Sequence, residues 1–171
     1  MRTLWLLRHA KTSPGEPGQG DHERKLEARG RAAAARLGRH LAERGVTPDL
    51  VLCSTARRAL ETLEGVAAAQ SEDWVVLEER DLYLASTGEL LRRLRAVPDG
   101  VRSVLLVGHN PGVGELALRL ATSGPADLRA ELRRKVPTGA LAELRLHEPH
   151  WRKLPRGCEL VSFVTPKRLP G

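Results

Sequence analysis

The sequence predicts an α/β protein, built as a three-layer α/β/α sandwich around a mainly parallel sheet. Short apolar runs alternate with helical patterns of ten or more residues, which is typical of strands joined by crossover helices. The chain of 171 residues has no evident linker or internal repeat, and this length suits one domain. We therefore expect a single domain over residues 1–171.

The first segments give a strand, a loop and a helix. The apolar run 3–8 predicts a buried strand, and residues 12–22 form a loop because they are rich in Pro and Gly. The stretch 26–44 predicts a helix, with Gly45 as its C-cap. Its apolar residues recur at spacings of seven and four: Leu26, Ala33, Leu37 and Leu41.

Two more strands and a helix follow. Residues 49–53 predict the second strand, and 55–70 predict a helix with Ser54 or Thr55 as its N-cap. The short apolar run 74–77 predicts the third strand.

The second half continues the alternation. A helix is expected over 86–97, with a Ser/Thr cap at its start, and a fourth strand over 103–108. A further helix is expected over 112–122, and the basic stretch 126–135 predicts a short helix or an ordered loop. Two closing strands are expected at 140–146 and 159–165.

The composition favours an anionic partner. The net charge is +7 and the pI is about 10.2, which suits phosphorylated substrates, acidic membrane surfaces or nucleic acid. Solvated arginine with no partner explains the charge equally well. Aromatic residues make up 3% of the chain and none lies within a basic run, which argues against nucleic-acid binding.

Cysteine usage and hydropathy favour a cytoplasmic protein. Cys53 and Cys158 lie far apart without CxxC spacing, so we expect two buried free thiols rather than a disulfide framework or a zinc site. The apolar run near the N-terminus is too short for a signal peptide, and no run approaches the roughly 20 residues of a membrane span.

Polar side chains follow three of the predicted strands. Arg8 and His9 end the first, Ser54 ends the second with Arg58 just beyond it, and His109 follows the fourth. Ligands of open α/β sheets bind outside the carboxyl ends of the strands, so we expect these side chains to meet in one pocket.

The residue types indicate phosphoryl chemistry. Two guanidinium groups match phosphate oxygens, and of two imidazoles one can attack phosphorus while the other donates a hydrogen bond. Metal binding is the competing use of two histidines, but dense arginine would repel a cation, so we expect neither a metal nor another cofactor.

Three motifs in this order resemble the histidine phosphatase superfamily, also called phosphoglycerate mutase-like. They are LLRHA at 6–10, STARRALET at 54–62 and VGHNPG at 107–112. LYLAS at 82–86 and PTGALA at 137–142 are similar to the SixA-type phosphohistidine phosphatases. The resemblance covers nearly the whole chain and implies a phosphoglycerate mutase-like fold.

The resemblance also implies roles for individual residues. His9 would be the nucleophile that becomes phosphohistidine, and Arg8, Arg58 and His109 would bind the phosphoryl group. Arg58 is preferred to Arg57 because it directly precedes alanine, as in the family motif.

Several further residues are candidates for substrate binding. Arg24 matches the arginine of the family's R-P-L-T segment and would reach the phosphate or position its loop. This sequence has Lys25 and Glu27 where that segment usually has proline and a small hydroxyl residue. Asn110 would bind phosphate, orient the second histidine or make the turn, and Tyr83 would line the pocket or lie in the core.

The general acid is the least defined part of the site. Larger superfamily members carry a carboxyl group after the third strand, and Glu79 or Asp81 is the candidate here, with Glu78 nearby. An alkoxide leaves badly without a proton, whereas the imidazole of phosphohistidine can be protonated on its remote nitrogen. The weak acid motif therefore favours a nitrogen–phosphorus substrate, such as a phosphohistidine-containing protein domain.

Three other functions stay open from the sequence. One is a phosphomonoesterase for a sugar, nucleotide or cofactor phosphate. The second is a non-catalytic module that binds phosphorylated ligands, and the third is nucleic-acid binding through the basic surface.

Overall fold

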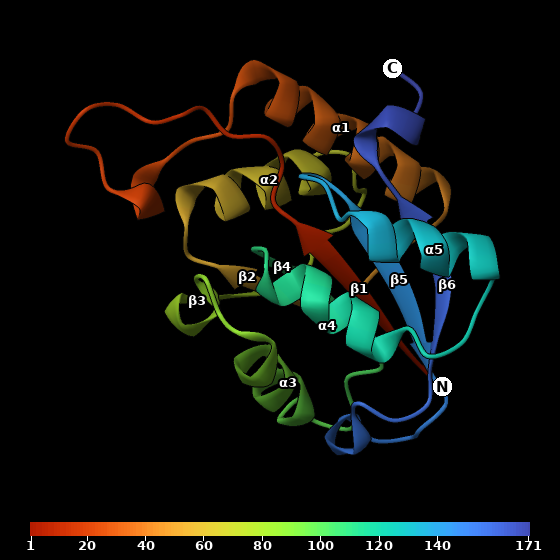
Figure 1. Cartoon of the computed structure of the whole chain (residues 1–171). Coiled ribbons are helices and arrows are strands. Elements are labelled where there is room, and N and C mark those ends of the chain that lie inside the picture. The colour runs from red at the N-terminus through yellow and green to blue at the C-terminus, as the bar shows by residue number, and fades with distance from the viewer.

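The computed structural model describes residues 1–171 as a six-stranded sheet between two layers of helices (Figure 1). The strand order across the sheet is β3-β2-β4-β1-β5-β6. The strands are β1 (Arg2–Arg8), β2 (Leu50–Ser54), β3 (Val76–Glu79), β4 (Ser103–Gly108), β5 (Leu141–Leu146) and β6 (Cys158–Val164).

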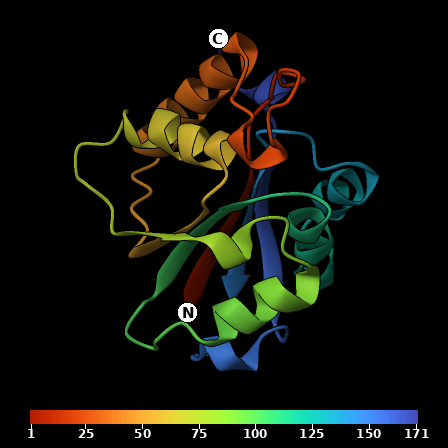
Figure 2. The same ribbon diagram turned by 90° about the vertical axis from the view of Figure 1, so that its left-hand side faces the viewer.

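Helices cover both faces of the sheet, as the two views in Figures 1 and 2 show. The α-helices are α1 (Ala28–Glu43), α2 (Arg57–Ala67), α3 (Thr87–Arg95), α4 (Gly112–Leu120) and α5 (Ala126–Arg134). Short 3-10 turns are η1 (Asp21–Glu23), η2 (Arg80–Leu82), η3 (Trp151–Lys153) and η4 (Pro166–Arg168). The pair α1 and α2 packs on one face and α3 to α5 on the other, which confirms the three-layer prediction.

The sheet is mainly parallel, as predicted. The strands β3, β2, β4 and β1 pair in parallel, whereas β5 runs antiparallel to both of its neighbours, β1 and β6. Because β5 is the one reversed strand, the carboxyl ends of β1, β2 and β4 all reach the same edge of the sheet.

Alternating side chains on β1 serve the two cores. Leu4 and Leu6 belong to the larger buried cluster beneath α3, α4 and α5. Trp5 and Leu7 point to the opposite face, into the smaller cluster beneath α1 and α2. Successive side chains of a strand point to opposite faces, so an uninterrupted apolar run is what a strand buried on both faces requires.

Three local predictions are confirmed. Ser86 caps α3 through a capping box with Glu89. Gly45 ends α1 one residue beyond its C-cap, Arg44, with a φ of 65° that favours glycine. The basic stretch after Pro125 forms α5, whose Leu132 is buried.

Most element boundaries shift by one to three residues from the sequence prediction, and two of the differences have a structural reason. The N-cap of α2 is Ala56, not Ser54 or Thr55. Ser54 lies two residues before this cap, and its hydroxyl accepts the Ala56 N–H at 3.2 Å. The third strand lies at Val76–Glu79, two residues later than expected. It is an edge strand, so Val76 and Leu77 remain 37% and 44% exposed and give no clean pattern of burial.

No helix in the chain is long and apolar enough to cross a bilayer.

Gly112, at the start of α4, tests how tightly this helix is packed behind the second histidine. A Cβ at this position would lie 2.1 Å from the Ala85 carbonyl oxygen. We expect Gly112→Ala to lower the free energy of unfolding by about 1–3 kcal/mol, measured by urea denaturation. Gly88→Ala is the control, since its Cβ would meet nothing closer than 4.0 Å and alanine favours the helix. Equal stability of the two variants would contradict the close packing.

Candidate active site

The strand register brings the two histidines together. Arg8 of β1 lies opposite Gly108 of β4, and each residue is followed directly by a histidine. The His9 N–H donates to the Gly108 carbonyl at 3.0 Å, which continues the ladder one step beyond the strand. The His9 and His109 ring centroids consequently lie 5.3 Å apart. Arg8, His9 and His109 therefore lie together at one edge of the sheet, where the sequence predicted them.

His9 is held in a single tautomer. Its Nδ1 lies 2.8 Å from the Ala10 carbonyl oxygen, which can only accept, so Nδ1 carries the hydrogen and Nε2 keeps its lone pair. The pKa of His9 is lowered to about 4, mainly by burial and also by the positive charges of Arg58 and Arg8, against the opposing effect of the Ala10 bond. The imidazole is therefore neutral near pH 7 and has a free nucleophilic nitrogen.

His109 is neutral for the same reasons. Burial lowers the pKa of His109 to about 3, aided by the nearby His9 and Arg58. Its Nε2 lies 2.8 Å from the Ser54 hydroxyl oxygen, and its Nδ1 is buried without a hydrogen-bond partner. Because the Ser54 oxygen already accepts the Ala56 N–H, its hydroxyl can donate to Nε2, and Nδ1 then carries an unpaired N–H.

Arg8 and Asn110 meet at one carbonyl group beside the histidines. Arg8 Nη1 and Asn110 Nδ2 each donate to the Val136 carbonyl oxygen at 3.0 Å. The Asn110 side-chain oxygen accepts the Gly114 N–H, so both ends of this amide hold the turn that follows β4. Arg8 Nε is buried without a partner, and burial lowers the pKa of Arg8.

Asp21 is a site residue that the sequence reasoning missed. Arg58, which is 4% exposed, donates from Nη1 to the Asp21 carbonyl at 2.7 Å and from Nη2 to Oδ2 at 2.9 Å. The Tyr83 hydroxyl also donates to Oδ2, and Arg24 Nη1 donates to Oδ1 at 3.2 Å. These donors, Tyr83 first, hold the pKa of Asp21 well below its usual range. In the sequence, the only indication was that Asp21 lies three residues before Arg24. No nearby residue indicates that Asp21 bonds to Arg58.

Tyr83 connects the same cluster to the second histidine. Its ring packs edge-on against His109, with centroids 5.5 Å apart, and against His22 at 4.8 Å. The Arg58 guanidinium carbon lies 5.8 Å from the centre of the Tyr83 ring. Tyr83 thus lines the site, which was one of the two expectations for it.

Arg24 fixes the loop that carries Asp21. Besides Asp21, it donates from Nη2 to the Thr12 hydroxyl at 2.7 Å and to the Ser13 carbonyl at 3.0 Å. Of the two expectations for Arg24, these contacts match the positioning of its loop.

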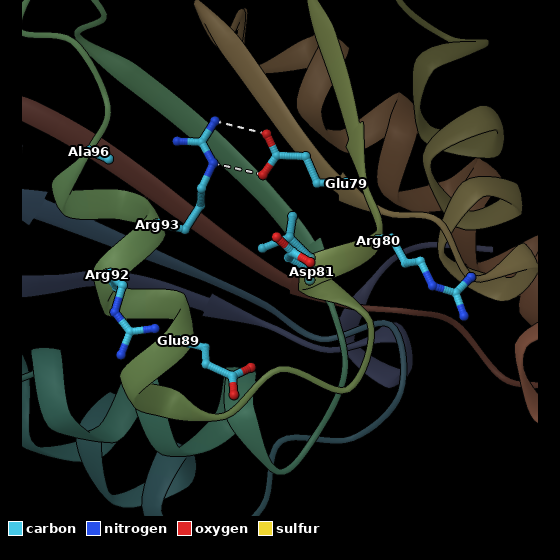
Figure 3. Close-up of a pocket in the computed structure, with 8 residues that line it drawn as sticks. Glu79, Arg80, Asp81, Glu89, Arg92, Arg93 and Ala96 are labelled. Carbon is cyan, nitrogen blue, oxygen red and sulfur yellow. Dashed lines mark hydrogen bonds and ion pairs between the residues drawn. The ribbon is translucent and has the colours of Figure 1, made fainter.

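The structure places the two candidate acids beside a different cavity. Both Glu79 oxygens accept N–H groups of Arg93, at 2.7 and 2.9 Å, in a bidentate ion pair (Figure 3). Asp81, in η2, lines the same cavity of about 850 Å³. Neither His9 nor His109 lines this cavity, and neither acid bonds to a residue of the histidine cluster.

Two other observations bear on the chemistry of the chain. Both cysteines are free and buried, and burial raises the pKa of Cys53 to about 12 and of Cys158 to about 11. No group of three or more His, Cys, Asp or Glu side chains is arranged to hold a metal ion.

Comparison with known proteins identifies the family. The family model of the histidine phosphatase superfamily, branch 1, matches residues 4–82. A solved structure from Nakamurella multipartitia, named by inference as a phosphohistidine phosphatase SixA, is 32% identical with a TM-score of 0.81, and 96% of each chain is covered. The chain belongs to the histidine phosphatase superfamily. It is a phosphatase of the SixA-like kind.

Further relatives agree over nearly the full length. A structure from Agrobacterium tumefaciens, also named by inference as SixA, is 31% identical with a TM-score of 0.82, over 96% of this chain and 98% of the other. An uncharacterised Mycobacterium tuberculosis protein is 35% identical over 94% of this chain and 100% of its own length. The SixA protein histidine phosphatase complexed with tungstate shares the fold, with a TM-score of 0.74 at 23% identity.

The protonation state of His9 can be measured directly. We expect its NMR titration midpoint near pH 4, rather than near the ordinary value of about 6.5, because burial disfavours the imidazolium. Since the unfolded chain then binds more protons between these pH values, the free energy of unfolding should fall as the pH falls from 6.5 to 4. A midpoint near pH 6.5 would show that the His9 ring is hydrated and that its neutrality is not built into the fold.

Ser54 should act through His109. We expect Ser54→Ala to reduce kcat/KM about fivefold, because one hydrogen bond that fixes the imidazole contributes roughly 1 kcal/mol. Steady-state kinetics on a phosphate ester would measure the loss. Ser162→Ala is the control, since that hydroxyl bonds to Glu143 on the far part of the sheet. Full activity of Ser54→Ala would exclude this positioning role.

Proposed function

We propose that the protein is a SixA-type protein phosphohistidine phosphatase that works through a covalent phosphohistidine on His9. The observation that carries this proposal is a pair of neutral, buried imidazoles with ring centroids 5.3 Å apart, beside two arginines. A neutral imidazole with a free nitrogen is a nucleophile, and guanidinium groups complement the charge on a phosphoryl group in transfer.

In the first step, the lone pair of His9 Nε2 attacks phosphorus. The bond from Nε2 to phosphorus forms as the bond from phosphorus to the substrate nitrogen breaks, and that nitrogen keeps the electron pair. The Nδ1–H of His9 stays on the Ala10 carbonyl and stabilises the positive charge that develops on the ring. Arg8, Arg58 and the free N–H of His109 would face the phosphoryl oxygens, which would satisfy the buried Nδ1 of His109.

In the second step, water attacks the phosphorus of phospho-His9. The bond from phosphorus to Nε2 breaks and its electrons return to the ring, so His9 becomes neutral again. Both protons of the water remain on the released phosphate, as H₂PO₄⁻. Neither step requires a metal ion or another cofactor for its balance of atoms and charge.

A nitrogen–phosphorus substrate fits these residues better than an ester. If the remote nitrogen of a phosphohistidine ring is protonated, the departing imidazole leaves neutral and needs no acid. An alkoxide needs a proton from the enzyme, and the two candidate carboxyl groups, Glu79 and Asp81, lie at another cavity. Transfer from phosphohistidine to His9 is therefore an exchange between two similar imidazoles.

The proposed substrate is a protein domain in the cytoplasm. The net charge of +7 suits an anionic phosphoprotein, and the two SixA-named structures are 31–32% identical over nearly the whole chain. Buried free thiols fit a reducing compartment.

The covalent intermediate provides the test. We expect brief exposure to phosphoramidate to leave acid-labile, alkali-stable phosphate on His9, located by mass spectrometry. His9→Ala should carry no phosphate and lose roughly 10³-fold or more in kcat, because it removes the nucleophile.

His150→Ala is the matched control, since that histidine is partly exposed and bonds to Asp99. It should retain full turnover and labelling. Equal turnover by wild type and His9→Ala would overturn the mechanism. Binding without turnover by the wild type would identify a phospho-binding module instead, and efficient turnover of phosphate esters alone would identify a small-molecule phosphomonoesterase.

A further inference from the structure

We propose that Asp21 is a specificity-determining residue, whose carboxylate accepts the N–H of a protonated imidazole leaving group and so selects nitrogen–phosphorus substrates over phosphate esters. This inference rests on the proposed function and adds to it a residue that recognises the leaving group.

Asp21 lies between the buried arginine and solvent. Its side chain is 45% exposed, whereas that of Arg58, to which it is bonded, is 4% exposed. Of this ion pair, the Asp21 carboxylate is therefore the member that a substrate arriving from solvent can contact. The leaving group of an in-line transfer lies opposite the attacking nitrogen, and His9 is 8% exposed, so we expect the leaving group on the side away from the protein interior.

The carboxylate has room for one more donor. Its two oxygens offer about four lone-pair sites. Three are used, since Oδ2 accepts from Arg58 and Tyr83 and Oδ1 accepts from Arg24. The free site on Oδ1 belongs to a group that stays ionised, because its three donors stabilise the negative charge. Asp21 is consequently an acceptor and not a proton donor.

An acceptor is what a phosphohistidine leaving group needs. When the phosphorus–nitrogen bond breaks, its electron pair moves into a ring whose remote nitrogen carries a proton. A carboxylate on that N–H keeps the proton in place and stabilises the cationic ring, so neutral imidazole departs. An ester leaving group presents an oxygen with no hydrogen, and its developing negative charge is repelled by the same carboxylate.

A purely structural role for Asp21 predicts a different result. If the carboxylate only positions Arg58, its loss weakens phosphoryl binding for every substrate alike. The structure allows the two roles of Asp21 to be tested separately. Arg58 Nη1 donates to the Asp21 backbone carbonyl oxygen at 2.7 Å, and this bond does not depend on the Asp21 side chain. Asp21→Asn is close in shape, keeps an oxygen acceptor and removes the charge.

The experiment compares two substrates on Asp21→Asn. One is free N-phosphohistidine, whose leaving imidazole carries a proton, and the other is p-nitrophenyl phosphate, whose phenolate leaves without one. We expect kcat/KM for phosphohistidine to fall about 10- to 100-fold, as for a lost hydrogen bond to a charged group. For the nitrophenyl ester we expect it to stay within about threefold or to rise.

Two control variants complete the test. Glu23→Gln makes the same change of charge on the same 3-10 turn, at a carboxylate that contacts His22, and should leave the substrate ratio unchanged. Tyr83→Phe removes a donor to Asp21 but keeps its charge, and should retain the preference for phosphohistidine.

An equal loss on both substrates by Asp21→Asn would overturn the proposal in favour of simple positioning. The two hypotheses fail separately, since a wild-type enzyme that forms no phospho-His9 refutes the proposed function before any substrate ratio is measured.

Discussion

The parallel pairing of β1 with β4 is the constraint on which the site depends. Neighbouring parallel strands end at the same edge, and the register that sets Arg8 opposite Gly108 makes the next residues neighbours. A slip of one residue would turn the side chains of one strand to the other face and separate the imidazoles. Leu4 and Trp5 pack into different cores, and the fit of these side chains on both faces opposes such a slip.

Burial at this edge sets the charge of the reacting groups. Two buried histidines lie beside arginines, so their pKa values fall and both rings remain neutral. The positive charge beside His9 then resides on arginines, with Arg8 and Arg58 nearest in effect and Arg24 adding to them. This division leaves one imidazole free to attack and the other free to donate, which a single pair of charged histidines could not do.

The loop that carries Asp21 turns this strand-end cluster into a closed network. Arg24 anchors the loop through Thr12, and Asp21 then bonds both Arg58 and Tyr83. A cluster of arginines alone would attract any phosphate without distinction. The half-exposed Asp21 carboxylate beside Arg58 would, as we propose, make the same site sensitive to the charge of the leaving group.

The sequence by itself determined the alternation of strands and helices, the two-sided core, and the motif residues Arg8, His9, Arg58 and His109. These features are local, because hydrophobic period and strand-end position are set by neighbouring residues. Only the tertiary structure decided that Asp21 bonds Arg58, that Ser54 bonds His109 rather than capping α2, and that Glu79 bonds Arg93. Each of these contacts joins residues 14 to 55 positions apart, so the packing of whole elements chooses the partner and no local pattern encodes it.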